Sequence, residues 1–340
     1  MVDAVPTEES SRFAASDPGL VEHLDTHGYV VVKEVASPDE VARALDLLWD
    51  HLQGAAGWSR EDPGTWTDES FTKLGDQFTG ILHSSGIGNS DYLWYLRTRP
   101  RVKEAFAAIW GTDDLITSFD GANVFRPWHL GHGAATVGGW IHVDQGKLKR
   151  GRQAVQGLVA VTDQTPGTGG LVVVPGSHHH HDEFVEAQGG SRDFVFVDQT
   201  APGVAGVTMR LVVCRAGDLV LWDSRTVHCN SPAIGEPGAD PGWAAGTVTP
   251  SCEARAPAPE PAPPGLLRAV GYVCMTPRSK ASEEILCARR RAYEERRTTS
   301  HWPHTPPSGL PGHKLLGMQQ YEAAPRERQD LIDGGLGRAG

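Results

Sequence analysis

Two residues with metal-binding side chains stand two positions apart in the middle of the sequence. They are His142 and Asp144, in the segment GGWIHVDQG. The segment is predicted to be a β-strand, and side chains at positions i and i+2 of a strand project from the same face. An imidazole and a carboxylate are therefore expected to point together toward whatever that face lines.

A third candidate ligand follows much later, in the segment GDLVLWDSRTVHCN. It is His228, which comes just after a predicted strand. Two histidines and one carboxylate are the ligand set of mononuclear non-haem Fe(II) sites, which keep coordination positions open for small molecules. Because an isolated His-x-Asp is common by chance, the prediction depends on all three residues and on their order along the chain.

An arginine on the next predicted strand extends this pattern. Arg268 lies in the segment LLRAVGYVC, among apolar residues. A guanidinium can hold a carboxylate through two parallel hydrogen bonds. A surface salt bridge at the start of a strand is the alternative reading, but the apolar neighbours favour a buried partner.

The most conspicuous histidines form a run of four, His178–His181, in the segment PGSHHHHD. Consecutive side chains in a loop or in the first turn of a helix point in different directions, so they converge on one ion less easily than residues of a strand. We interpret the run as structural, or as an adventitious metal-binding segment. His178 is a candidate for closing the turn.

The sequence around these residues predicts a β-rich core. From about residue 114 to residue 275, short β-rich runs alternate with turn-forming Gly, Pro, Asp and Asn. Many short strands without long helices between them favour an antiparallel sandwich or barrel of the jelly-roll type. Residues 232–264 are rich in proline and are predicted to be a long mobile loop inserted in that core.

The flanking segments are predicted to be mainly helical. Residues 1–15 are expected to form a disordered tail. A strand at 29–33 is followed by a helix whose start is marked by Ser37 as N-cap, Pro38 at the first helical position and Glu40 three residues after the cap.

After the core, residues 279–340 are predicted to be a helix and a surface wrap. Trp302 and His304, in the segment SHWPH, would belong to that wrap. Residues 16–340 together are expected to form one domain.

Composition narrows the class of protein. The 340 residues carry a formal net charge of -11, and the one basic cluster is interleaved with glutamates, which argues against nucleic-acid binding. Five cysteines without a CxxC spacing favour free thiols in a reducing compartment. No targeting segment and no apolar run long enough to span a bilayer is visible. We therefore expect a cytoplasmic protein without membrane association, and the sequence leaves the oligomeric state open.

Taken together, the motifs resemble the phytanoyl-CoA dioxygenase family of Fe(II)- and 2-oxoglutarate-dependent oxygenases. The resemblance depends on GYVVVKEVASPDEV, WIHVDQ, GLVAVTDQTPGTGGLVVVPGSH, GDLVLWDSRTVHCNSP and RAVGYVC, which cover most of residues 28–280 in the family's order. The segment GTGGLVVVPGSH is especially diagnostic. The resemblance implies a mainly β fold, with a double-stranded β-helix (jelly-roll, cupin-like) core and flanking α-helices.

The resemblance also implies roles for individual residues. His142, Asp144 and His228 would bind Fe(II), and Arg268 would bind the distal carboxylate of the co-substrate 2-oxoglutarate. Family members place this arginine closer to the second histidine, whereas here the insertion separates the two by 40 positions. Arg255, within the insertion, is therefore the second candidate.

The implied reaction uses O2 as the other co-substrate. It would hydroxylate or desaturate a small-molecule metabolite and release succinate and CO2. Related halogenases have a small residue in place of the carboxylate ligand, so Asp144 favours hydroxylation or desaturation over halogenation.

Other residues near the motifs are weaker candidates. Asn230, Ser231 and Asn123 are candidates for contacting 2-oxoglutarate, with ordinary turn chemistry or structural hydrogen bonding as the alternative. Trp140 and Gln145 flank the His-Asp pair and are candidates for lining the substrate site, with simple packing as the alternative.

Two other classes of function stay open from the sequence. A non-catalytic or regulatory jelly-roll protein would bind a small molecule without turnover, although the intact ligand set argues against it. A cupin-like isomerase or lyase would need a metal but no 2-oxoglutarate. Succinate formation from 2-oxoglutarate separates both classes from an oxygenase.

Overall fold

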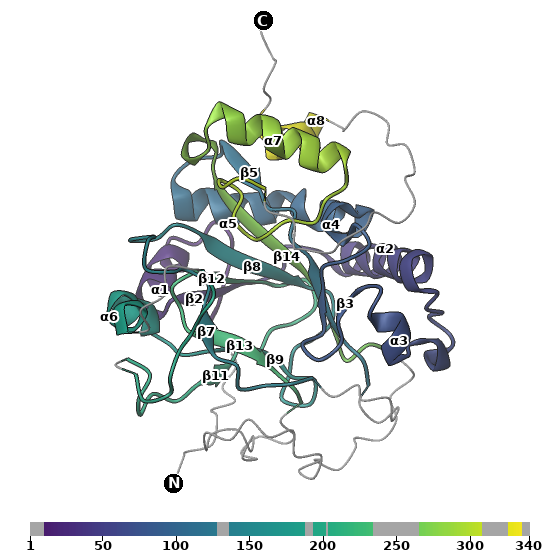
Figure 1. Ribbon diagram of the computed structural model, residues 1–340, viewed down its shortest axis with the longest axis horizontal. Helices are drawn as coiled ribbons and strands as arrows, with labels where there is room; N and C mark the ends of the chain where they lie inside the picture. Colours follow the sequence, from purple (N-terminus) through teal and green to yellow (C-terminus); the bar gives the residue numbers. More distant parts are fainter. Residues whose placement is uncertain are drawn as a thin grey trace, which may run out of the picture.

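Two β-sheets lie face to face at the centre of the protein (Figure 1). The computed structural model describes residues 10–127, 136–187, 193–201, 203–233, 265–307 and 326–334. The larger sheet consists, in spatial order, of β1 (Arg12–Phe13), β2 (Tyr29–Val32), β12 (Leu219–Asp223), β8 (Val155–Ala160), β14 (Arg268–Pro277), β6 (Ala122–Phe125), β4 (Ile81–Leu82) and β3 (Gly75–Asp76), with β5 (Leu115–Thr117) also paired to β14. The smaller sheet consists of β10 (Val195–Phe196), β7 (His142–Val143), β13 (His228–Ser231), β9 (Gly170–Val173) and β11 (Arg210–Leu211).

Strand alternation divides the side chains between the interior and the outside. In β14, Val270 and Tyr272 join an apolar cluster between the sheets, whereas Ala269 and Val273 join the cluster on the outer face. Arg268 has the parity of Val270, so its side chain also faces the interior. Neighbouring strands pair antiparallel in both sheets, except β1 with β2, which gives the predicted jelly-roll.

Helices cover the outer face of the larger sheet, and Figure 1 shows α7 and α8 at one end of it. The helices are α1 (Gly19–His27), α2 (Pro38–Ala56), α3 (Asp68–Phe71), α4 (Asp91–Arg97), α5 (Pro100–Trp110), α6 (His181–Ala187), α7 (Glu283–Glu294) and α8 (Arg326–Asp333). Short 3₁₀ helices lie at η1 (Pro63–Thr65), η2 (Ile87–Asn89), η4 (Ser177–His180) and η5 (Arg278–Lys280). Apart from the others, α6 packs Phe184 and Val185 against the outside of the smaller sheet.

The start of α2 confirms the predicted capping box. The Ser37 hydroxyl accepts a hydrogen bond from the Glu40 amide, and the Ser37 amide donates to the Glu40 carboxylate at 2.8 Å. Each side chain thereby satisfies a backbone N–H that has no partner within the helix. The sequence signature therefore places the first turn of this helix correctly.

The expectation of a disordered tail through residue 15 is wrong for its last residues. Arg12 and Phe13 form β1, which pairs in parallel with β2. The Arg12 guanidinium donates two hydrogen bonds, of 2.9 and 2.7 Å, to the fully buried Asp218 carboxylate. A buried carboxylate needs such a partner, and this long-range pair fixes a segment whose local sequence carries no strand pattern.

Several predicted segments fall partly outside the described residues. The proline-rich insertion 232–264 is described only at residues 232 and 233, and the predicted second candidate Arg255 lies outside the description. The predicted C-terminal helix is present as α7, with the Ser282 hydroxyl as its N-cap. Within the described part of the chain, no helix combines the length and the apolar character needed to cross a membrane.

Candidate active site

The three predicted metal ligands meet on the inner face of the smaller sheet. His142 on β7 lies directly across from His228 on β13, and Asp144 follows β7. His142 Nε2 is 3.5 Å from Asp144 Oδ1, and His228 Nε2 is 3.2 Å from Asp144 Oδ2. One ligand atom from each residue lies within 4.8 Å of the other two, and all three side chains are buried. This spacing suits a single cation held on one side.

Main-chain carbonyls orient both imidazoles. His142 Nδ1 donates to the Trp140 carbonyl at 3.1 Å, and His228 Nδ1 donates to the Thr226 carbonyl at 2.9 Å. Because each Nδ1 carries the proton, each Nε2 keeps a lone pair directed at the shared centre. The backbone two residues earlier thus fixes both the ring orientation and the tautomer that a metal requires.

The protonation states also suit a divalent cation. Burial alone would raise the pKa of Asp144, but His301, His228 and His142 outweigh that effect and hold its pKa well below the usual range. Burial, followed by the nearby His228, lowers the pKa of His142. Gln156 on β8 donates a hydrogen bond to Asp144 Oδ2. At neutral pH the site therefore presents neutral His142 and a carboxylate, which are the forms that bind metals.

Gln145 follows Asp144 directly, and its side-chain amide is hydrogen-bonded to the surrounding chain. Its amide nitrogen donates to the carbonyls of Lys149 and Gly151, and its amide oxygen accepts from the Ser224 hydroxyl at 2.8 Å. The side chain is fully buried. The prediction that Gln145 lines the substrate site is therefore wrong: a glutamine bonded at both ends of its amide positions the turn instead.

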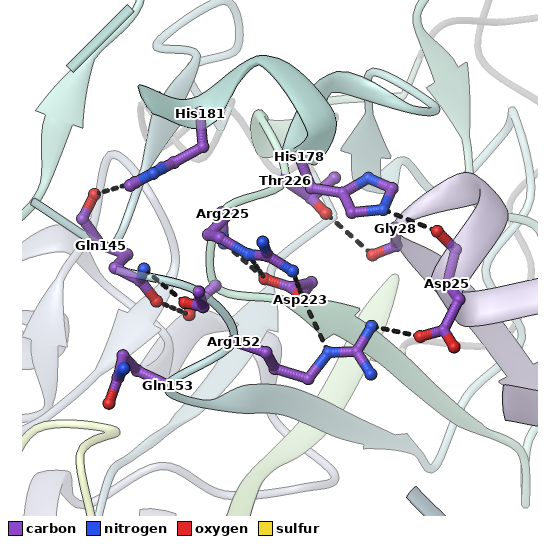
Figure 2. Close-up of polar contacts among 12 residues, drawn as sticks. Asp25, Gly28, Gln145, Arg152, Gln153, His178, His181, Asp223, Arg225 and Thr226 are labelled. Atoms are coloured by element: carbon purple, nitrogen blue, oxygen red, sulfur yellow. Dashed lines mark hydrogen bonds and ion pairs between the residues drawn. The ribbon is translucent and has the colours of Figure 1, made fainter. Parts of the chain in front are cut away.

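The four-histidine run does not converge on one point. His178 Nε2 donates to the Asp25 carbonyl at 2.9 Å, and His181 Nε2 donates to the Gln145 carbonyl at 2.7 Å, as Figure 2 shows. Both of these rings are buried, whereas His179 is exposed. The structural interpretation of the run is confirmed for His178 and His181, and His181 reaches the residue that follows Asp144.

A buried ion-pair network stabilises the loop before His228. The Asp223 carboxylate accepts hydrogen bonds from Arg152 and Arg225, each at 2.8 Å, and Arg152 also pairs with Asp25 on α1 (Figure 2). Burial would raise the pKa of Asp223, but the two arginines lower it to about 2. The network fixes the turn from which Thr226 and His228 project.

Arg268 lies on the inner face of the larger sheet and is fully buried. Its Nε donates to Gln164 at 2.9 Å and its Nη1 donates to Asn123 at 2.6 Å. Nη2 has no well-aligned partner among the described residues, and the Tyr272 hydroxyl lies nearby. Burial lowers the pKa of Arg268, with Tyr272 acting in the opposite direction. A buried guanidinium with an unused donor is costly alone and suits a carboxylate ligand.

The other polar candidates separate into three cases. Asn123 holds the Arg268 side chain and donates to the Thr79 carbonyl, so it orients the arginine. Asn230 has the parity of His228 on β13, so its side chain faces the interior near Tyr272. Ser231 has the opposite parity, and its hydroxyl donates to the Pro232 carbonyl at 2.9 Å. The prediction that Ser231 contacts the co-substrate is wrong, because alternation turns it away from the interior.

Some residues at the site escaped the sequence interpretation. Gln156 and Trp222 face the interior by strand alternation, a pattern that was available in QAVQGLVAV and GDLVLWD. The Trp222 ring lies 5.5 Å from the His228 ring, and its Nε1 is buried without a partner among the described residues. His301 lowers the pKa of Asp144 through its charge, and it lies in a segment that has no strand alternation from which this could be predicted.

The SHWPH segment is not the surface wrap that was predicted. Trp302 is buried against Ala154 and Cys274, and the Lys149 ammonium lies 4.4 Å from the centroid of its ring. Cys274 pairs in the sheet with Gln156, which bonds Asp144. The apolar contact of Trp302 with a strand 28 positions earlier in the sequence is not visible in the local sequence.

Aromatic rings flank the His142 ligand. Trp140 stacks on His142 with ring centroids 4.9 Å apart, and Phe194 lies 4.2 Å from it on a tilted ring plane. Trp140 is half-buried. The structure therefore places Trp140 beside the candidate metal centre, while its contact with a substrate stays a prediction.

Known proteins resemble this chain in sequence and in fold. The family model described as phytanoyl-CoA dioxygenase (PhyH) matches residues 24–233, which include all three ligands. The chain belongs to the phytanoyl-CoA dioxygenase family. PhyH enzymes use Fe(II), 2-oxoglutarate and O2, and the buried His-Asp-His group fits that cofactor set. The predicted enzyme class is confirmed: the protein is an Fe(II)- and 2-oxoglutarate-dependent enzyme.

Relatives of this PhyH protein include a curated fungal protein and solved structures. The "Ava biosynthesis cluster protein O" of Aspergillus versicolor is 27% identical over 291 residues, covering 82% of this chain and 83% of the relative. The epimerase SnoN, solved with Fe3+, alpha ketoglutarate and nogalamycin RO, has a TM-score of 0.50 at 20% identity and covers 76% of this chain and 84% of its own. EctD from S. alaskensis with bound Fe has a TM-score of 0.50 at 16% identity, with coverages of 83% and 84%. The shared fold confirms the predicted fold class.

Proposed function

We propose that this enzyme hydroxylates or desaturates a small organic metabolite. In the hydroxylation, one O2 and one 2-oxoglutarate are consumed with the substrate C–H bond, and the products are the C–OH compound, succinate and CO2. One observation carries the proposal. A single interior holds three convergent metal-ligating side chains on one sheet and a buried arginine with an unused nitrogen on the other.

The metal end of this interior fits Fe(II). His142 Nε2, His228 Nε2 and an Asp144 oxygen would hold the ion, and three protein ligands leave the rest of the coordination sphere for co-substrates. A loaded site of this kind supplies dioxygen activation coupled to the decarboxylation of a 2-oxo acid. Asp144 supplies the third ligand as a carboxylate, which favours oxygenation over halide transfer.

The opposite end of the interior fits a dicarboxylate. Arg268 is held by Gln164 and Asn123, so its remaining nitrogen is oriented before any ligand arrives. Tyr272 lies beside it, and Asn230 lies near Tyr272. These residues would hold the distal carboxylate of 2-oxoglutarate while its other end lies toward the triad. A charged group in so dry a site contributes orientation as well as affinity.

The apolar lining between the two ends would exclude water. It comprises side chains from both sheets, among them Tyr29, Leu158, Val173, Val220 and Trp222. Exclusion of water protects reactive species from side reactions and strengthens the electrostatic contacts of the site. The lining therefore supports an oxidative reaction better than small-molecule binding without turnover.

The substrate is proposed to be a metabolite of secondary metabolism. The name of the Aspergillus versicolor relative places that relative in a biosynthesis cluster, and the relative covers most of this chain. The described residues carry no membrane-spanning helix, and the chain has an acidic net charge, which suits a small-molecule substrate better than a nucleic acid. We also place the enzyme in the cytoplasm on the composition of its cysteines.

The test is succinate formation by protein that has been reconstituted with Fe(II) without oxygen and then exposed to O2 and 2-oxoglutarate. Arg268→Gln is expected to raise the KM for 2-oxoglutarate about tenfold to hundredfold, because a charge-assisted hydrogen bond contributes about 1.5–3 kcal/mol. Arg60→Gln, which removes an exposed arginine paired with Asp46, is the matched control. If Arg255 rather than Arg268 binds the carboxylate, Arg255→Gln will show the large effect instead.

Two outcomes would overturn the proposal. Metal-dependent conversion of a substrate without any need for 2-oxoglutarate would indicate an isomerase or lyase. Failure of wild-type protein to bind Fe(II), or to form succinate once it is loaded, would indicate a regulatory binding protein.

A further inference from the structure

Exposed aromatic rings gather at the edge of the smaller sheet. Among the described residues, the large apolar side chains that are exposed are Phe78, Leu148, Phe194, Phe196 and Val207. Phe194 is 46% exposed and Phe196 is 59% exposed, and their ring centroids lie 5.1 Å apart in an edge-to-face arrangement. Two adjacent rings that stay in contact with water mark a binding surface more often than a packing defect.

Strand register puts these rings on the metal side of the sheet. β10 pairs antiparallel with β7, with Phe196 opposite His142 and Val195 opposite Val143. Val195 and Val143 pack together in the outer apolar cluster, so Phe196 and His142 share the inner face. Phe194, two residues from Phe196, has the same parity, and its ring lies 4.2 Å from the His142 ring.

The backbone of Phe194 is strained in a way that keeps its ring in place. Its φ is +63°, a left-handed conformation that bulky residues seldom adopt. The Phe194 amide donates to the Asp144 carbonyl at 3.3 Å, and the preceding Asp193 accepts from the Gly146 amide at 3.0 Å. The metal-ligand turn therefore holds this segment directly, and strain of this kind gathers at functional sites.

Trp140 extends the aromatic surface past the ligand. It stacks on His142 with an interplanar angle of 11°, on a ring that Phe194 also contacts. Support of His142 alone would account for Trp140 and Phe194. It does not account for Phe196, which is the most exposed of the three rings and packs on Phe194.

We propose that Trp140, Phe194 and Phe196 form the binding surface for a flat, aromatic ring system of the primary substrate. This inference rests on the proposed function, because the reacting carbon must come close to the metal centre that His142 borders. Aromatic side chains favour flat rings through stacked and edge-to-face contacts, beyond their general preference for apolar surface. A saturated ring of the same size gains only the apolar contact.

A pair of size-matched probes tests this inference: 2-naphthol and trans-decahydro-2-naphthol. Each is titrated without oxygen into protein loaded with Fe(II) and 2-oxoglutarate, and binding is followed by the change in the visible charge-transfer absorption of the complex. Wild type is expected to bind 2-naphthol about tenfold more tightly than the saturated alcohol, as a ring contact of roughly 1.4 kcal/mol gives.

Variants of Phe196 test whether this side chain causes the preference for the aromatic probe over the saturated one. Phe196→Ser is expected to reduce the ratio of the two dissociation constants to about twofold or less, and Phe196→Leu to an intermediate ratio, since leucine keeps apolar surface but no ring. Val207→Ser removes another exposed apolar side chain and is expected to keep the wild-type ratio. Because both probes are measured on the same loaded sample, a variant that misfolds is recognised by its missing absorption band.

The outcomes separate this inference from the proposed function. Equal affinities in wild type, no binding of either probe up to its solubility, or an unchanged ratio in both Phe196 variants would each overturn the aromatic surface. Absence of the absorption band in wild type would instead overturn the Fe(II)–2-oxoglutarate site itself.

Discussion

Two pairs of buried histidines differ in the nitrogen that each imidazole leaves available. In His142 and His228, Nδ1 donates to the carbonyl two residues earlier, so Nε2 faces Asp144. In His178 and His181, Nε2 donates to a carbonyl of a distant segment. The first pair directs its free lone pairs at one carboxylate, whereas the second pair uses its outer nitrogens to connect parts of the fold.

The difference shows that a local density of histidines is a poor guide to a metal site. Four consecutive residues at the start of a helix point in several directions, and two of them, His178 and His181, are buried and connect parts of the fold. Residues on neighbouring strands share a face by register, so two isolated histidines far apart in sequence can meet. Whether a buried histidine can bind a metal depends on whether its side chain converges with other ligands and on whether the nitrogen that faces them is free of a hydrogen bond.

Removing a member of the first pair is expected to have the largest effect. His228→Ala takes away one of three ligands and should abolish both Fe(II) binding and succinate formation. His178→Ala removes an equally buried ring that connects to α1 and should lower stability while one Fe(II) per chain is still bound. The iron content of each variant after desalting without oxygen is the measurement. Retention of iron by His228→Ala would contradict the assignment of His228 as a metal ligand.

A smaller effect is expected for the residue that orients the shared carboxylate. Gln156→Leu removes the hydrogen bond to Asp144 Oδ2 and should weaken Fe(II) binding about tenfold to hundredfold, as the loss of an outer-sphere partner usually does. Gln153→Leu, three positions earlier, removes a side-chain amide that donates to the Arg150 carbonyl and is the control. A competition titration against a chelator compares them, and equal affinities would show that Asp144 needs no such partner.

The second pair is expected to affect stability. His181→Ala leaves the buried Gln145 carbonyl without its donor and opens a cavity, which should lower the free energy of unfolding by about 2–3 kcal/mol. His179→Ala changes an exposed neighbour in the same run and should have almost no effect. Urea unfolding of the metal-free protein measures both, and similar midpoints would contradict a structural role for His181.

A buried histidine outside both pairs makes a further test of the comparison. His51 Nε2 is buried without a hydrogen-bond partner in the described structure, and burial lowers the pKa of His51 from 6.5 to about 4. The unfolded chain then binds more protons below pH 6.5, so stability falls as the pH drops toward 4. The expected loss from this residue is about 2 kcal/mol between pH 7 and pH 5. His51→Leu should reduce the acid sensitivity of urea unfolding, and an unchanged pH profile would contradict this assignment.

The sequence predicted the parts of this structure that depend on local pattern. The capping box at Ser37, the strand-borne His142 with Asp144 just past the end of that strand, and the arginine on the next long strand all follow from periodicity and motif order. Strand parity could also have placed Ser231 and Gln156 correctly, had each residue been assigned to a face. Those two errors are avoidable.

Other features depend on contacts between distant segments. β1 forms because Arg12 pairs with Asp218, about two hundred positions away. Trp302 is buried because it packs against Ala154 and Cys274, which lie far from it in the sequence. Phe194 contacts His142 because its backbone adopts a left-handed conformation, and no turn motif in the sequence predicts that conformation. Such features need the assembled fold, because neither periodicity nor composition encodes which distant residue will be the partner.

The central claim is that iron binds at His142, Asp144 and His228, and that 2-oxoglutarate binds to that iron. The most direct measurement is a titration, without oxygen, of the purified protein with Fe(II) and then with 2-oxoglutarate, followed by visible charge-transfer absorption. We expect a band that saturates at one Fe(II) per chain, is absent in His142→Ala and persists in His179→Ala. A band that survives in His142→Ala, or that is lost in His179→Ala, would contradict it.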